Sequence, residues 1–286
     1  MMTYRHLIRS VTLSIALLVT LLALLTSATS GARAEDEGKY PDWSGQWFRT
    51  GGVQFDPTKP LGRGQQAPLT PEYQAKLDAS IADIAAGGQG LNEHTSCLPH
   101  GMPRMMNAVY PMEFVVQPKI TYILFEDNLP RRIYTDGRDF PKEIEPSYYG
   151  YSIGKWVDEN GDGRYDVLEI ETRGFKGPRS YEATGLPLHH DNESVIKERM
   201  YIDKTDPDTL HDEITVMDHA LTRPWTVDKH YKRDHDPVWF LNECSEDNRH
   251  VFFNGEGYFI SGDDFLMPAK KDQAPPDLRY FKPAPK

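Results

Sequence analysis

The chain has 286 residues, carries a formal net charge of −11 at pH 7 and has a mean hydropathy of −0.61. Such an acidic chain repels the phosphates of nucleic acid and anionic lipid headgroups, so a DNA- or RNA-binding role is disfavoured. No G-x-S-x-G elbow, H-E-x-x-H helix, Walker loop or dinucleotide fingerprint is found in the sequence. Ordinary serine hydrolases, zincins and nucleotide enzymes are therefore disfavoured as well.

The first 34 residues are typical of a secretory signal peptide. Arg5 and Arg9 precede an uncharged apolar run over residues 11–25, and Ala32-Arg33-Ala34 offers a cleavage site between small residues. A membrane anchor is the alternative, but the run falls short of the ~20 residues needed to span a bilayer. We expect cleavage after Ala34, a periplasmic or secreted protein and no membrane insertion afterwards. Cleavage removes three basic residues and no acidic one, so the net charge goes from −11 to −14.

The chain contains two cysteines, Cys97 and Cys244. In an oxidising compartment two such residues most simply form one disulfide bond, and a pair of free thiols is the alternative. In the chain-entropy model a bridge across so long a loop would contribute about 4–5 kcal/mol. The expected bond is structural and indicates no particular function.

Residues 35–108 are expected to form an N-terminal extension that contains one helix, at about residues 70–86. Thr70 can cap it, Pro71 suits its first position, and the glycines at 87–88 end it. The spacing predicts one buried stripe along this helix, made of Tyr73, Leu77, Ile81 and Ile84.

Residues 109–266 are expected to form an antiparallel β domain, followed by a proline-rich extended tail over residues 267–286. Short segments rich in β-branched and aromatic residues alternate with turn signals. The predicted strands are 112–117, 120–126, 131–135, 149–157, 166–174, 194–203, 209–218, 225–233, 238–244 and 250–260. Short connections favour a meander that closes as a barrel, and a sandwich or a propeller fragment is the alternative. Gly45-Gln46-Trp47 resembles the G-x-W that begins the first strand of lipocalin-like (calycin) barrels, where the Trp plugs one end.

The sharpest motif lies in residues 158–169 and matches D-x-[DN]-x-[DN]-G-x5-E. Ca²⁺ takes six to eight oxygen ligands, and the motif supplies several within nine residues. The expected ligands are the side chains of Asp158, Asn160, Asp162 and Asp166 together with the carbonyl of Arg164. Strand patterns on both sides argue against an EF-hand, and the loop resembles those at β-hairpin tips in FG-GAP-type repeats. An acidic Asn-Gly hairpin turn is the alternative.

Candidate catalytic residues are His189, His190, Glu198, Arg199 and Arg223. The two histidines lie in a polar segment that could hold a metal ion or serve as a general base. Glu198, Arg199 and Arg223 place charges in segments of alternating hydrophobicity, and polar residues that face into a small barrel mark a ligand cavity. A solvated loop for the histidines and a surface ion pair for the others are the structural alternatives.

Several segments together resemble a widespread group of exported bacterial proteins of unknown function. The resemblance extends over about residues 40–250 and rests on residues 97–104, 134–138, 150–156, 171–175, 185–189 and 222–229. It implies no activity, but it implies a shared constellation of Asp136, Arg138, His189, Glu198, Arg199 and Trp225. In this group a short turn often replaces the acidic loop, which favours a local, structural role for calcium.

Two functions remain open at this point. The first is an exported barrel that binds a small apolar or aromatic molecule and has a structural Ca²⁺ site. The second is a periplasmic lyase, isomerase or hydrolase in which His189 or His190 and Glu198 form an acid–base pair, and Arg199 or Arg223 holds an oxyanion.

Overall fold

The computed structural model describes residues 38–51, 56, 67–91, 97–177, 193–238, 250–253, 256–263 and 265–276. The predicted signal peptide, His189, His190 and Cys244 lie outside these ranges. Within them, no helix is long and apolar enough to cross a membrane.

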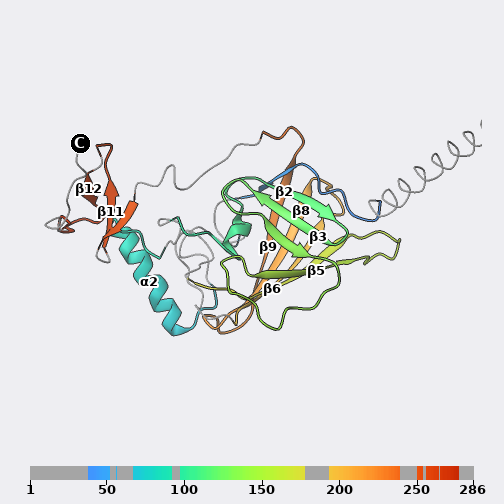
Figure 1. Ribbon diagram of the computed structural model, residues 1–286, viewed down its shortest axis with the longest axis horizontal. Helices are drawn as coiled ribbons and strands as arrows, with labels where there is room; N and C mark the ends of the chain where they lie inside the picture. Colours follow the sequence, from blue (N-terminus) through green and yellow to red (C-terminus); the bar gives the residue numbers. More distant parts are fainter. Residues whose placement is uncertain are drawn as a thin grey trace, which may run out of the picture. The chain divides into compact units, whose positions relative to one another are not determined.

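Nine strands form one closed barrel in sequence order, which confirms the predicted lipocalin-like barrel with, among the described residues, a single α-helix (Figure 1). They are β1 (Gln46–Arg49), β2 (Met112–Gln117), β3 (Ile120–Phe125), β4 (Arg131–Tyr134), β5 (Tyr151–Val157), β6 (Val167–Arg173), β7 (Val195–Ile202), β8 (Thr209–Met217) and β9 (Trp225–Asp234). The short strand β1 pairs with both β2 and β9 and so closes the barrel.

One strand pair departs from the antiparallel meander that the short connections predicted. β4 and β5 run parallel and share only two residue pairs, Ile133 with Ser152 and Tyr134 with Ile153. Residues 135–150 return the chain to the end of the barrel at which β4 begins. Gly154 permits the close approach, because a Cβ there would lie 2.7 Å from Ile133 Cγ2. This seam and the β1–β2 pair, with two paired residues each, are the weakest pairings between strands that follow each other in the chain.

The barrel interior is filled by alternate residues of the strands and by a short 3-10 helix, η3 (Arg104–Asn107). Met105 and Met106 of η3 are buried, as is Trp47 of β1. Trp47 Nε1 donates a hydrogen bond of 3.0 Å to the carbonyl of Trp43. Trp47 is thus buried at the start of the barrel, as the resemblance to calycins implied.

The α-helix α2 (Pro71–Ala85) begins where the sequence indicated, with the Thr70 hydroxyl accepting from Tyr73 N at 3.4 Å. Its buried side chains are Tyr73, Leu77 and Ser80, and Ile84 is 40 % exposed. The predicted apolar stripe is therefore wrong in its C-terminal half. Segment 250–260 was predicted as one strand and is two, β10 (His250–Phe253) and β11 (Glu256–Ile260), which form a small sheet with β12 (Leu266–Pro268).

Among the described residues, 38–42 and 158–166 form a separate compact unit. In this unit the backbone N–H of Tyr165 donates to the carbonyl of Lys39 at 2.7 Å. The rings of Tyr40 and Tyr165 lie 5.1 Å apart. The acidic loop is thus held by backbone and ring contacts from the chain's described start.

Candidate functional site

A charged network crosses the inside of the barrel. Arg131 of β4 forms a two-pronged ion pair with Glu198 of β7, and its Nη1 donates to Glu198 Oε1 at 2.7 Å. Arg131 Nη2 also donates to Thr172 at 3.1 Å and to Ser152 at 3.4 Å. Because β4 and β7 are not neighbours, these side chains can meet only in the interior. Burial alone would lower the pKa of Arg131, but the attraction of Glu198 raises it.

A second carboxylate, that of Asp212 on β8, is fully buried near this pair. Neither of its oxygens has a hydrogen-bond partner among the described residues, and burial together with the charge of Glu198 raises its pKa well above the usual value. Lys229 of β9 is also buried, and desolvation lowers its pKa to about 7. The hydroxyl of Tyr231 donates to the carbonyl of Met106 at 2.6 Å. The interior thus combines a satisfied ion pair with a carboxylate whose hydrogen-bonding capacity is unused.

A hollow of about 210 Å³ opens at the parallel seam between β4 and β5. Arg131 and Ser152 are among its lining residues, but their side chains point into the barrel, and that of Arg131 is only 1 % exposed. Its other walls include three tyrosines, Tyr134, Tyr149 and Tyr151, and burial raises the pKa of Tyr149. The hollow offers aromatic surfaces to a small molecule.

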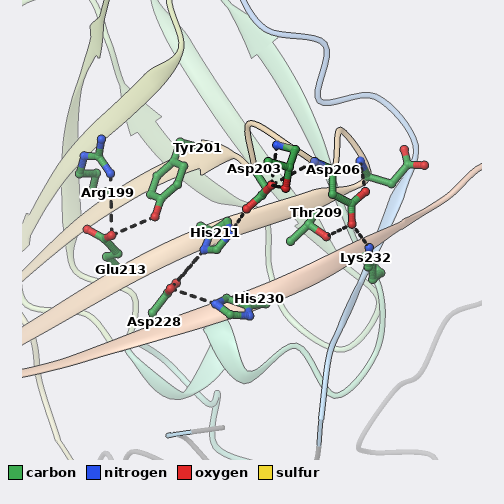
Figure 2. A network of polar contacts seen from close by, with 12 residues as sticks. Arg199, Tyr201, Asp203, Asp206, Thr209, His211, Glu213, Asp228, His230 and Lys232 are labelled. Atoms are coloured by element: carbon green, nitrogen blue, oxygen red, sulfur yellow. Dashed lines mark hydrogen bonds and ion pairs between the residues drawn. The ribbon is translucent and has the colours of Figure 1, made fainter. Parts of the chain in front are cut away.

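A cluster of two histidines and a carboxylate lies on the outer face of β8 and β9 (Figure 2). His211 Nδ1 and His230 Nε2 lie 3.1 Å and 2.9 Å from Asp228 Oδ2. His211 Nε2 lies 3.2 Å from Asp203 Oδ2, and hydrogen bonds, first of all from the Thr205 side chain, lower the pKa of Asp203. Among the described residues, this is the group of metal-ligating side chains whose ligand atoms converge within 4.8 Å.

A shallow groove of about 590 Å³ lies on the outer face of β5 to β9, under the segment around Phe140. Its lining contains five acidic and four basic residues, among them Arg199 and Glu213, whose closest charged atoms lie 3.8 Å apart. Arg138 also lines it and is bound to Asp136 and to the Tyr151 hydroxyl. The charges of this groove largely satisfy each other.

The candidate catalytic residues that the structure describes do not converge. Glu198 points into the barrel and pairs with Arg131, whereas Arg199 lies on the outer face. Arg223 is exposed in the turn before β9 and donates to the Pro224 carbonyl at 3.3 Å. Since His189 and His190 lie outside the described residues, an acid–base pair with Glu198 stays a prediction. Of the constellation implied by the resemblance, Asp136 and Arg138 are bound to each other.

The loop over residues 158–166 is folded by hydrogen bonds from its backbone to its acidic side chains. Asp158 accepts from Gly161 N at 2.7 Å and from Gly163 N at 2.9 Å, and Asp166 accepts from Glu159 N at 2.9 Å. Gly163 has a φ of +87°, which provides the sharp bend expected at this position. Asp158, Asp162 and Asp166 are not drawn together as closely as the histidine cluster. The loop has the bend and the oxygen donors that Ca²⁺ requires, and calcium binding stays a prediction.

Cys97 lies among the described residues, none of which is a free cysteine. Its expected partner Cys244 is outside them, so the pairing stays a prediction.

Sequence analysis missed three charged residues of the interior, Arg131, Asp212 and Lys229. Each interrupts an alternating apolar pattern at an inward position, for example Leu210, Asp212 and Ile214. The same signal drew attention to Glu198. A consistent search for charged residues that alternate with apolar residues at inward positions would have found the other three. The convergence of His211 with His230 depends on the register of β8 and β9, which the sequence pattern leaves open.

The fold and the site together define a closed barrel with a charged interior. No family model matches the chain, and no solved structure matches it. Among curated proteins, argininosuccinate synthase from Methanopyrus kandleri is 39 % identical over 75 residues, which is 26 % of this chain and 17 % of that protein. A match over so small a share of both proteins does not place the chain in a family.

Proposed function

We propose that this chain is an exported barrel protein that binds a small aromatic molecule at the seam between β4 and β5, with its polar group near Arg132. The observation that carries the proposal is a hollow at this seam whose lining includes three tyrosines and the exposed Arg132. Ligand sites in proteins are mostly apolar or aromatic clefts with a few polar groups that fix orientation.

The energetic cost of the interior network supports a functional role. Placing an ion pair inside a protein costs several kcal/mol per ion, and apolar residues of similar volume often stabilise a fold equally well. Asp212 adds a buried carboxylate with no hydrogen-bond partner in the described part of the chain, although buried polar groups are nearly always paired. Perturbed titratable groups of this kind concentrate at functional sites.

The shape of the hollow selects the ligand class. Its volume of about 210 Å³ is below the range of about 300–1,000 Å³ typical of drug-sized ligands, so a single ring with a short substituent is the expected size. The tyrosines offer ring faces and edges for aromatic contacts, each contributing about 0.5–1.5 kcal/mol beyond the buried area. Arg132 lines the hollow and is exposed, so it is the donor expected for an oxygen of the ligand.

Ligand-observed NMR with benzoate, benzyl alcohol and benzylamine tests this proposal on the mature, oxidised protein. At least one of the three compounds should bind, with the oxygen-bearing pair ahead of benzylamine. Tyr149→Leu should weaken that binding about three- to tenfold, because one aromatic wall is lost. The matched control is Tyr122→Leu on β3, outside the hollow, which should leave binding unchanged.

Two results would contradict the proposal. One is that none of the three compounds binds the wild-type protein. The other is that Tyr149→Leu and Tyr122→Leu have the same effect on affinity.

The acidic loop supports a second part of the proposal, a structural Ca²⁺ site at residues 158–166. Removal of calcium with EDTA should lower the thermal unfolding midpoint, and millimolar calcium should restore it. Asp162→Ala should abolish this response, because it removes an oxygen at the centre of the motif, whereas Asp263→Ala, outside the loop, should retain it. An unchanged wild-type midpoint would reduce the loop to a hairpin turn.

A further inference from the structure

We propose that His211, Asp228 and His230 bind a divalent transition metal ion on the outer face of the barrel, with Asp203 as a supporting residue. The position of the three side chains follows from the sheet. His211 and His230 are direct partners across β8 and β9, and Asp228 lies two residues before His230 on the same face. The site is separate from the acidic loop and from the hollow at the β4–β5 seam.

Two of the three distances between the ligand atoms are close to those of a coordination polyhedron. Both imidazole nitrogens approach the same oxygen, Asp228 Oδ2, at 3.1 Å from His211 and 2.9 Å from His230. Bonds of 2.0–2.1 Å to a tetrahedral Zn²⁺ place neighbouring ligand atoms about 3.3 Å apart. All three ligand atoms lie within 4.8 Å of one another, so side-chain movements alone would bring them around an ion.

The remaining nitrogen of His211 has the partner that metal-binding histidines usually have. His211 Nε2 lies 3.2 Å from Asp203 Oδ2, and a carboxylate in this place fixes the tautomer and makes the imidazole a better ligand. Asp203 is itself fixed, because its Oδ1 accepts from the hydroxyl and the backbone N–H of Thr205, both at 2.7 Å.

The ring plane of His211 is also fixed before any ion binds. Tyr201 stacks on it with ring centroids 4.8 Å apart and an interplanar angle of 2°. The Tyr201 hydroxyl donates to Glu213 at 3.0 Å, and Glu213 faces Arg199 (Figure 2). Side chains held by such contacts lose little freedom on binding an ion, which favours affinity.

The donor set selects the class of ion. Two imidazoles and one carboxylate suit Zn²⁺, Cu²⁺ and Ni²⁺, whereas Ca²⁺ and Mg²⁺ prefer oxygen ligands alone. The carboxylates of Asp203 and Asp228 balance the two charges of the ion. The basic side chain nearby in the network, Lys232, is paired with Asp206. Three protein ligands leave a coordination position open, and Asp228 and His230 are each 40 % exposed, so this position faces solvent.

The same contacts have a simpler explanation, in which a protonated His211 bridges Asp203 and Asp228 without any metal. Zinc binding separates the two explanations, since an imidazolium cannot be a ligand. The test is calorimetric titration of the mature, oxidised, metal-free protein with Zn²⁺, in the presence of calcium to saturate the acidic loop.

The wild-type protein should bind one Zn²⁺ per chain. His230→Ala should weaken binding at least tenfold, and Asp203→Asn should weaken it about 10- to 100-fold through its effect on His211. His235→Ala removes an exposed histidine outside the cluster and should leave the affinity unchanged within about twofold. A double variant, His189→Ala with His190→Ala, should also retain the site.

Three results would overturn the proposal. They are the absence of stoichiometric binding by the wild type, equal affinity in His230→Ala, and loss of binding only in the His189/His190 double variant. Because His230 is partly exposed, circular dichroism and thermal unfolding without metal should show that His230→Ala folds as the wild type does.

Discussion

The two faces of β8 and β9 carry similar residues in opposite surroundings. On the inner face, Asp212 and Lys229 are direct partners and are removed from water. On the outer face, Asp228 and His230 are the two neighbours of Lys229 along β9, and both are partly exposed. Burial raises the pKa of Asp212 and lowers that of Lys229, so both inner groups are driven toward their neutral forms.

This difference shows which kind of evidence is informative on each face. Inside the barrel a charged group is costly, so its presence alone calls for a function. Outside, ion pairs form at little cost and contribute little, so their presence indicates nothing. There only a specific geometry counts, such as two imidazoles that converge on one carboxylate oxygen.

The largest expected effect is loss of the inner ion pair. Arg131→Met should lower the free energy of unfolding by about 3–5 kcal/mol, because it leaves Glu198 charged and unpaired in the interior. Arg199→Met is the matched control on the outer face and should cost less than about 1 kcal/mol. Urea unfolding of both variants measures the difference. Equal losses would show that the interior is more accessible to water than its burial indicates.

A smaller effect is expected in the pH dependence of stability. Lys229 holds its proton in the unfolded chain up to its usual value of 10.5 but releases it at about 7 in the folded protein. Between these limits the unfolded state binds more protons, so Lys229 makes stability rise with pH, by at most about 1.4 kcal/mol per unit. Below about pH 7 Lys229 is protonated in both the folded and the unfolded state, and the stability gained at higher pH is lost.

Unfolding measured from pH 6 to 10 checks this expectation by difference from the wild type. Lys229→Met should remove the rise, so that its stability relative to the wild type falls as the pH increases. Lys232→Met on the outer face should keep a constant difference from the wild type, since Lys232 is half exposed. A constant difference for Lys229→Met as well would contradict the burial of the Lys229 ammonium group.

The barrel could be predicted from the sequence because alternation and turn signals act locally. Segments such as 112–117 and 209–218 match β2 and β8 closely, and Thr70 marks the start of α2. The parallel pairing of β4 and β5 could not be predicted, because it depends on how residues 135–150 cross the barrel end. The hollow, which lies at this seam, was hidden for the same reason.

The site was predicted only in part. Glu198 was singled out as a charge in an apolar pattern and lies inside the barrel, but its partner Arg131 is 67 residues away along the chain. Strand register, which sequence patterns leave open, decides that His211 lies opposite His230. Contacts between distant segments thus define both sites, and single-sequence patterns carry little information about such contacts.

The central claim is that the seam between β4 and β5 takes a small aromatic molecule independently of the outer histidine cluster. The most direct test measures the affinity of the best-binding compound among benzoate, benzyl alcohol and benzylamine for Tyr149→Leu and for His230→Ala, in metal-free buffer. We predict that Tyr149→Leu lowers the affinity about three- to tenfold, which corresponds to the loss of one aromatic contact. His230→Ala should bind the compound with the affinity of the wild type. Loss of binding in His230→Ala with full binding in Tyr149→Leu would contradict the account and place the ligand on the outer face.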